Sequence, residues 1–239
     1  MHQLINEHYP NTITSHVVEG DHAIFTSENN TMLRIEVITD HVFRFRYTAK
    51  GYFEKDFSYA MDENHRTGFT HFIIKEKAKA FELSTPKMTC LIQKENMKVS
   101  IFGEDGKLLN EDEKGFHWEE NLQQGGNIVK MSKKSITGEY YYGLGDKASN
   151  LNLRDRRFQN WGTDEYGFAK DADPLYRNIP FYYGLHKEGA YGIFFDNSFR
   201  TFFDFAKERK STTSFWAEGG EMNYYFICGS SLMNIAQRY

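Results

Sequence analysis

The chain has 239 residues, of which 40% are hydrophobic and 16% aromatic, and its formal net charge is −4. This composition is too apolar for a disordered chain, and the length allows one large domain with a substantial core. The small net charge and the scattered Lys and Arg residues indicate no nucleic-acid partner. No apolar run reaches the roughly 20 residues of a membrane span, so we also expect no membrane partner.

The cysteines and histidines form no recognisable ligand pattern. Cys90 and Cys228 lie in alternating apolar runs, where free thiols are usually buried. The nine histidines show no spacing typical of a metal site, so we predict no metal and no cofactor. The N-terminus, MHQLINEHYP, lacks the basic start and apolar centre of a secretory signal. This favours a cytoplasmic protein, and the alternative is that a signal has been removed.

Period-two alternation predicts strands along most of the chain. In residues 31–47, for example, Leu33, Ile35 and Val37 alternate with charged residues, and Phe43 and Phe45 do the same after a turn. Glycines at 103 and 106 indicate a hairpin, whereas the charged residues 107–124 read as a polar surface loop. Further strands are predicted at 71–75, 80–85, 88–93, 98–102, 127–131, 179–185, 190–195, 211–217 and 222–227.

One segment alone has a helical period. After Ser230 or Ser231 as N-cap, the residues Leu232, Ile235, Ala236 and Tyr239 fall on one helix face. Natural domains seldom end inside such a helix, so we expect the protein to continue beyond this point. The pattern as a whole predicts an all-β fold, a large antiparallel β-sandwich over residues 1–229, with the start of a linker helix at 230–239.

A long polar loop, residues 159–176, lies between two predicted strands and is the main candidate site. It holds Trp161 and four acids, Asp164, Glu165, Asp171 and Asp173. Aromatic rings stack on sugar rings and carboxylates bind sugar hydroxyls, so this combination suits a carbohydrate ligand. A pair of these acids can also serve glycoside hydrolysis, although exposed loop acids are usually only solvated.

Two further polar groups have simple structural interpretations. Asp196, Asn197 and Ser198 follow an apolar run, and such residues commonly form a turn whose side chains bond to nearby backbone. Three arginines can bind an anionic substrate or pair with carboxylates such as Asp155 and Asp164; they are Arg154, Arg156 and Arg157.

Four blocks of sequence, in order along the chain, carry a resemblance. They read GLGDKASNLNLRDRRFQNWGTDEYGF, DPLYRNIPFYYGL, AYGIFFDNSFRTFFDF and GGEMNYYFICGSSLMNIAQRY. This order resembles glycoside hydrolase family 31 and looks like the N-terminal domain that precedes the catalytic barrel of its α-glucosidases. The resemblance implies a galactose-mutarotase-like β-sandwich. For the full-length protein it implies a retaining hydrolase that removes terminal α-linked glucose.

The same resemblance implies which residues take part in function. Both catalytic carboxylates of the family lie on a (β/α)₈ barrel, for which this chain has no room, so we expect no catalytic residue here and no activity of this chain alone. The family's N-terminal loop reaches over the barrel mouth, and its aspartate in the sugar pocket corresponds to Asp164. The sequence departs from the family pattern at Gly162, where Asn is usual, and at Asp146, where Glu is usual. The glycine leaves the loop backbone less defined.

The leading hypothesis is therefore a non-catalytic domain that packs on the catalytic barrel of the same polypeptide and binds an α-glucoside through Asp164. One alternative is a free-standing carbohydrate-binding module. Another is a mutarotase-type enzyme that uses a His and a Glu as acid and base, for which His186 is the histidine nearest the loop.

Overall fold

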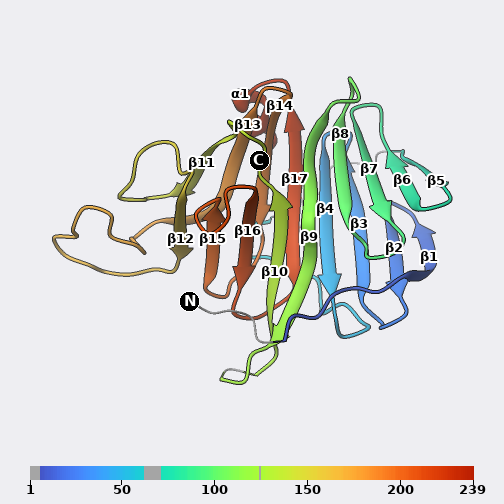
Figure 1. Ribbon diagram of the computed structural model, residues 1–239, viewed down its shortest axis with the longest axis horizontal. Coiled ribbons are helices and arrows are strands. Elements are labelled where there is room, and N and C mark those ends of the chain that lie inside the picture. The colour runs from blue at the N-terminus through green and yellow to red at the C-terminus, as the bar shows by residue number, and fades with distance from the viewer. Residues whose placement is uncertain (1–5, 62–70, 124) are drawn as a thin grey trace.

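The alternating segments form two antiparallel sheets packed face to face, as a computed structural model covering residues 6–61, 71–123 and 125–239 shows (Figure 1). The fold is thus the predicted large β-sandwich. The first sheet has eight strands in the order β1-β2-β3-β4-β17-β14-β13-β11. Its strands are β1 (Ile13–Glu19), β2 (His22–Ser27), β3 (Met32–Thr39), β4 (Val42–Thr48), β11 (Tyr140–Gly145), β13 (Asn178–His186), β14 (Gly189–Phe195) and β17 (Met222–Gly229).

The second sheet has nine strands in the order β12-β15-β16-β10-β9-β8-β7-β6-β5. Neighbouring strands along the chain are mostly neighbours in the sheet, as in a meander of hairpins. Its strands are β5 (Ile73–Glu76), β6 (Ala80–Ser84), β7 (Met88–Gln93), β8 (Val99–Gly103), β9 (Leu108–Glu120), β10 (Asn127–Lys134), β12 (Arg156–Asn160), β15 (Thr201–Phe205) and β16 (Thr212–Ala217).

The core between the sheets is rich in aromatic side chains, which pack together with aliphatic ones. Phe45 stacks on Tyr224 with ring centroids 5.0 Å apart, and Phe215 packs edge-on against Tyr224 at 5.5 Å. Burying one such side chain contributes about 1.5–3 kcal/mol. The run at β7 follows the predicted pattern, because Met88, Cys90 and Ile92 all face the core. Both Cys90 and Cys228 are free and buried, as predicted.

The prediction of a polar surface loop over residues 107–124 is wrong for most of that range. Residues 108–120 form β9, a 13-residue strand paired with β8 and β10. Its charges misled the prediction because one of them points inward. Asp112 accepts a hydrogen bond from Lys133 Nζ at 2.7 Å, and both side chains are at most 1% exposed. A buried charge paired in this way is compatible with a central strand.

The other predicted strands are confirmed within two residues, except that β10 extends three residues beyond the predicted 127–131. The hairpin between β8 and β9 is also confirmed, and in it Gly103 N–H donates to the Lys107 carbonyl. The structure adds strands that the sequence analysis did not assign, namely β1, β2, β11, β12 and β15. Strand β1 is an edge strand with mostly exposed residues, so its pattern has no apolar face to detect.

The C-terminal helix α1 (Leu232–Arg238) begins at the predicted N-cap, Ser231, whose Oγ accepts from Asn234 N–H at 3.2 Å. Ile235 alone is fully buried in it and packs over β14 and β17 at Gly192 and Gly229. A Cβ on Gly192 would come within 2.7 Å of Ile235, so these glycines allow the helix to approach the sheet. In the described residues, no helix has the length and apolar character needed to cross a membrane.

Candidate functional site

The 159–176 loop projects from the sandwich between β12 and β13, as the amber segment of Figure 1 shows. Its base is fixed by Asp173. One carboxylate oxygen of Asp173 accepts from Gln159 N–H at 2.7 Å, and its carbonyl accepts from Gln159 Nε2 at 3.2 Å. Asp173 is thus a structural residue that ties the end of the loop to its beginning, and not a solvated acid.

A buried lysine completes this anchor. Lys147 Nζ donates to the Gln159 carbonyl at 2.8 Å and also contacts the carboxylate of Asp173 and the amide oxygen of Asn178, both at 3.3 Å. Burial lowers the Lys147 pKa, and the adjacent Asp173 carboxylate opposes that shift. Sequence reasoning missed Lys147, because nothing in its local pattern indicates that the chain returns to cover it.

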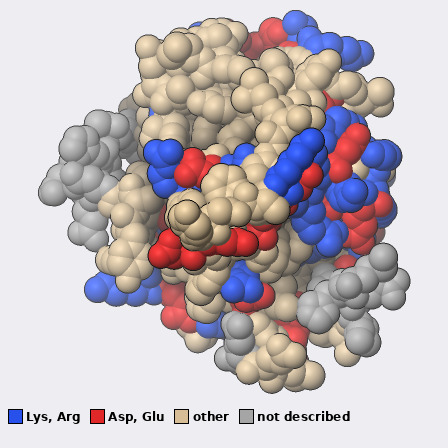
Figure 2. All heavy atoms as spheres, turned by 90° about the vertical axis from the view of Figure 1, so that its left-hand side faces the viewer, with Lys and Arg blue, Asp and Glu red and all other residues tan. Residues whose placement is uncertain are grey.

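The outer part of the loop is exposed. Asp164 is exposed and, within the part of the chain that the structure describes, forms no hydrogen bond or ion pair. Four aromatic side chains of the same loop are also exposed: Trp161, Tyr166, Phe168 and Tyr176. Figure 2 views the molecule from the side on which the loop projects and shows acidic and basic groups intermingled with uncharged surface. The loop therefore exposes both a carboxylate without a protein partner in the described residues and several aromatic rings.

Of the remaining loop acids, Asp171 and Asp173 are engaged through their carboxylates, whereas Glu165 is held only through its backbone carbonyl. Asp171 pairs with Arg156 at 2.5 Å, and this hydrogen bond lowers the Asp171 pKa. The carbonyl of Glu165 accepts from the Tyr176 hydroxyl. Two of the three arginines, Arg156 and Arg157, thus pair with carboxylates, although not with the two named as examples. Arg157 contacts Asp204 and Glu208, Arg154 binds Ser135 and backbone carbonyls, and Asp155 pairs with Lys210.

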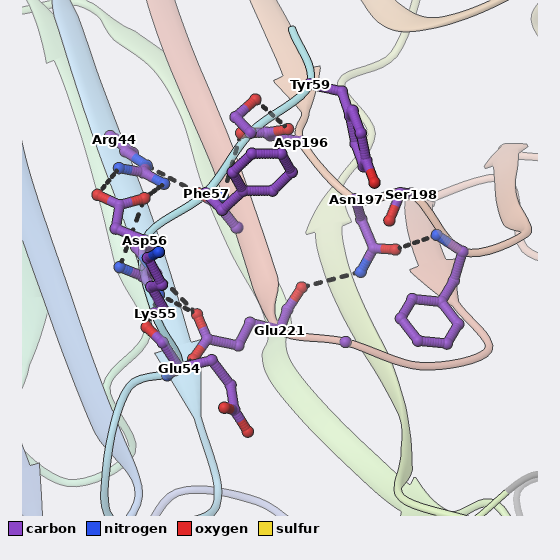
Figure 3. A pocket seen from close by; sticks show the side chains of 15 residues that line it. Arg44, Glu54, Lys55, Asp56, Phe57, Tyr59, Asp196, Asn197, Ser198 and Glu221 are labelled. Carbon is purple, nitrogen blue, oxygen red and sulfur yellow. Dashed lines mark hydrogen bonds and ion pairs between the residues drawn. The ribbon is translucent and has the colours of Figure 1, made fainter. Parts of the chain in front are cut away.

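A pocket of about 300 Å³ lies where residues 54–59 cross β4 and β17 (Figure 3). The exposed rings of Phe57 and Tyr59 form an edge-on pair at 4.8 Å on its rim. Asp196 lies beside these rings, where it accepts from Ser58 Oγ at 2.9 Å and from Asn223 Nδ2 at 3.3 Å. Burial raises the Asp196 pKa, although the Ser58 hydrogen bond opposes the shift.

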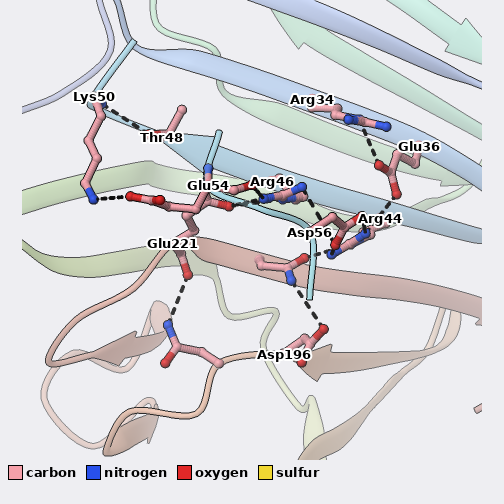
Figure 4. Close-up of polar contacts among 12 residues, drawn as sticks. Arg34, Glu36, Arg44, Arg46, Thr48, Lys50, Glu54, Asp56, Asp196 and Glu221 are labelled. Carbon is pink, nitrogen blue, oxygen red and sulfur yellow. Dashed lines mark hydrogen bonds and ion pairs between the residues drawn. The ribbon is translucent and has the colours of Figure 1, made fainter. Parts of the chain in front are cut away.

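The floor of this pocket is a network of ion pairs (Figure 4). Arg44 donates to both carboxylate oxygens of Asp56, at 2.7 and 2.9 Å, and to Glu36 at 3.1 Å. Arg46 donates twice to one carboxylate oxygen, Oε2 of Glu221, at 2.5 and 3.0 Å. Because each guanidinium is matched by carboxylates of the protein itself, this network clamps residues 54–56 onto the sheet and leaves no guanidinium for an anionic ligand.

The turn at residues 196–199 behaves as predicted at Asn197. Its Oδ1 accepts from Phe199 N–H at 2.8 Å, and its Nδ2 donates to the carbonyls of Gly219 and Glu221. The next residue, Arg200, lies 4.9 Å from the centre of the Trp161 ring. The turn therefore supports the first aromatic residue of the loop.

His186 does not suit the acid–base role that the mutarotase alternative requires. It is buried, its Nε2 lies 2.9 Å from the Leu109 carbonyl, and its Nδ1 accepts from Glu188 N–H at 3.3 Å. Both ring nitrogens are thus occupied by backbone. Within residues 6–61, 71–123 and 125–239, no group of three or more His, Cys, Asp or Glu side chains is arranged to hold a metal ion.

The fold and the loop define a sandwich domain of the kind found in glycosidases, and sequence comparison specifies the family. Residues 32–204 match the glycosyl hydrolase 31 N-terminal galactose mutarotase-like domain, and the chain belongs to this family. An α-glucosidase 2 of Bacillus thermoamyloliquefaciens is 32% identical over 168 residues, which are 70% of this chain and 21% of that protein. An isomaltosyltransferase of Sporosarcina globispora is 26% identical over 187 residues, which are 72% of this chain and 16% of that protein.

Solved structures agree with this assignment. A family 31 dextranase of Flavobacterium johnsoniae, in complex with isomaltotriose, superposes with a TM-score of 0.86 at 30% identity. The match covers 97% of this chain and 28% of the dextranase. An α-xylosidase from a soil metagenome shares the fold, with a TM-score of 0.77 at 16% identity. The chain therefore spans only part of the length of these enzymes, from 16% of the isomaltosyltransferase to 34% of the α-xylosidase.

Proposed function

We propose that this chain is the non-catalytic N-terminal domain of a retaining α-glucosidase and that the 159–176 loop helps to form the substrate pocket of the catalytic barrel in the same polypeptide. In this proposal residues 1–229 are the sandwich domain, and residues 230–239 lead towards the barrel. The observation that supports it best is Asp164, an exposed carboxylate without a protein partner among the described residues, on a loop whose base is anchored.

The chemistry available to the loop is binding rather than catalysis. Retaining hydrolysis needs two free carboxylates about 5–5.5 Å apart across the glycosidic bond. Asp171 and Asp173 are already engaged by Arg156, Gln159 and Lys147, so neither is free to act as the second carboxylate. Glu165 is exposed, and in the described residues no contact holds its carboxylate opposite Asp164. An ionised Asp164 accepts hydrogen bonds from sugar hydroxyls, and the exposed ring of Trp161 offers a stacking surface.

The test uses the full-length enzyme with a terminal α-glucoside as substrate. A hydrogen bond to a charged group contributes about 1.5–3 kcal/mol, so Asp164→Ala should lower kcat/KM by about 10- to 100-fold. Asp171→Ala is the matched control, because it removes a carboxylate from the same loop that already pairs with Arg156. An unchanged kcat/KM in Asp164→Ala would contradict the assignment.

The exposed aromatic residues of the loop also favour one alternative, a free-standing carbohydrate-binding module. The two functions differ in what the chain does alone. As a pocket-completing domain it lacks the barrel half of the site, so we expect it neither to hydrolyse maltose nor to bind it through the loop in the micromolar range. Calorimetric titration of the 239-residue chain with maltose separates them, and micromolar binding abolished by Trp161→Ala would favour the module.

A further inference from the structure

A second polar pocket, of about 260 Å³, lies on the outer face of the nine-stranded sheet over β9, β10 and β16, which run side by side in Figure 1. Alternation explains why it is hollow. Val129, Met131 and Phe215 point into the core, so Lys130, Ser132 and Ser214 point outward. Ser132 and Ser214 lie directly opposite each other in the ladder. Because both are small, they leave a depression beside the longer Lys130.

Two buried groups that line this pocket, His117 Nε2 and Thr212 Oγ1, have no hydrogen-bond partner in the described structure. The nearest acid to His117 Nε2 is the Glu7 carboxylate, whose Oε1 lies 4.0 Å away, beyond hydrogen-bond distance. His117 is 1% exposed and Thr212 is 6% exposed. A buried polar atom without a hydrogen bond costs about 1–3 kcal/mol, so each such atom calls for an explanation. A bound ligand that supplies the missing hydrogen bonds would provide one.

The state of His117 defines what it offers to a ligand. Its Nδ1 lies 3.0 Å from the Gly115 carbonyl, which only accepts, so Nδ1 carries the proton. Burial lowers the His117 pKa to about 4, although the Gly115 carbonyl opposes the shift. The ring is therefore neutral at pH 7, and Nε2 presents a lone pair to the pocket. It can accept from a hydroxyl or an N–H, whereas it opposes an anion.

Lys130 supplies the complementary donor. Within the described part of the chain it has no ion pair, and its ammonium lies 5.0 Å from the centre of the Trp216 ring. The other charged groups that line the pocket are paired. Lys114 contacts Glu7 at 2.6 Å, Arg209 contacts Glu113 at 3.0 Å, and Arg157 pairs with both Asp204 and Glu208. The lining therefore has three bases and three acids and no excess of either sign.

We propose that this pocket binds a neutral polyhydroxylated ligand of about the size of one monosaccharide. Such a ligand accepts from Lys130 Nζ, donates to His117 Nε2, and exchanges hydrogen bonds with the hydroxyls of Thr212, Ser132 and Ser214. A phosphate or carboxylate would satisfy the lysine and the hydroxyls but would face the His117 lone pair and the carboxylates of Glu7 and Glu208. Among the described residues, no Phe, Tyr or Trp ring lines the pocket for stacking, so the expected dissociation constant is about 1 mM.

This site is independent of the function proposed for the loop. It involves no residue of the 159–176 segment and needs no catalytic barrel. Asp164→Ala should therefore leave binding at this pocket unchanged, and the variants described next should leave the loop intact.

The test is a nuclear magnetic resonance titration of the 239-residue chain with D-glucose in the millimolar range. We expect shifts of the His117 ring signals and of backbone amides in β9, β10 and β16. Thr212→Val removes one hydroxyl at nearly constant volume and should weaken binding about fivefold, the loss expected for one neutral hydrogen bond. Lys130→Met removes a charged donor and should weaken it about tenfold or more.

Inorganic phosphate and Asp164→Ala are the controls. Shifts of the same signals with phosphate but not with glucose would overturn the proposal in favour of an anion site. The absence of shifts with glucose would also overturn it. So would variants Thr212→Val and Lys130→Met that bind glucose as tightly as the unmodified chain. Thermal unfolding of both variants confirms that a loss of binding is not a loss of fold. Ser214→Leu fills the depression without removing a charge and should abolish the shifts as well.

Discussion

Two regions of the molecule, the β9–β10 pair and the 159–176 loop, each contain aspartates, but these aspartates differ in burial and in pairing. In β9, Asp112 is enclosed between the sheets and bound by Lys133 of β10 and by the backbone N–H of Val99. In the loop, Asp164 is exposed and has no partner among the described residues. Local sequence does not distinguish them, since both lie among charged and polar neighbours.

The difference shows that the role of a carboxylate is set by what the fold places opposite it. A buried carboxylate must be neutralised, and it then contributes to a specific strand register. An exposed one is nearly neutral for stability and is free to bind a ligand. Substitutions in the two regions should therefore give a graded series of effects on stability.

The largest effect is expected at the buried pair. Asp112→Ala leaves the Lys133 ammonium unpaired between the sheets and should lower the free energy of unfolding by about 3–5 kcal/mol. Denaturant unfolding measures it. The double variant Asp112→Ala with Lys133→Met removes both charges and should recover most of the loss. If stability does not recover, the unpaired Lys133 ammonium is not the cause of the loss in Asp112→Ala.

A pH dependence of similar size is expected from His117 on the same strand. Burial lowers its pKa to about 4, whereas the unfolded ring titrates near 6.5. The unfolded state therefore binds more protons between these values, and stability should fall by up to about 3 kcal/mol as the pH drops from 6.5 to 4. His117→Gln should remove this part of the pH profile, as urea unfolding at a series of pH values would reveal. An unaltered profile would assign the dependence to other groups.

In the loop, Asp173 should matter most for stability. Asp173→Ala removes the hydrogen bonds to Gln159 and Lys147 and leaves a buried ammonium less well satisfied, at a cost of about 1–3 kcal/mol. Amide hydrogen exchange should increase around residues 159–176. If exchange there is unaffected, the anchor lies elsewhere.

The smallest effect is expected at Asp171, whose ion pair with Arg156 is largely exposed. Exposed pairs contribute about 0–1 kcal/mol, so Asp171→Ala should lower stability by less than about 1 kcal/mol, and less in high salt. Thermal unfolding at two salt concentrations checks this. If Asp171→Ala lost as much stability as Asp173→Ala, the two aspartates would not differ in their contribution to anchoring the loop.

The sequence was sufficient for the elements whose pattern is local. Alternation predicted β3, β4, β7, β13 and β14, and an N-cap followed by periodic apolar residues predicted α1. It was insufficient where two distant segments meet. The partner of Asp112 lies 21 residues away, and that of Arg46, Glu221, lies 175 residues away. Arg46 alternates with core residues and reads as solvent-facing, but residues 53–56 cover it.

The two candidate sites also differ in whether local sequence could identify them. Asp164 was identified through the resemblance of its surrounding blocks to a known family, and its role stays a prediction. The pocket at His117 and Lys130 depends on Ser132 and Ser214 being opposite in the ladder. That register follows from the whole sheet, and no single segment of sequence reveals it.

The close packing of α1 against the sheet also limits which substitutions homologues of this chain can carry. Gly192 and Gly229 each lie so close to Ile235 that a Cβ at either position would come within 2.8 Å of it. Gly192 on β14 is distant in the chain from Gly229 and Ile235, yet a larger side chain at any one of the three positions would clash with its neighbours. A homologue with a side chain at 192 or 229 should carry a smaller residue at 235 or a displaced helix, so substitutions at the three positions are expected to occur together.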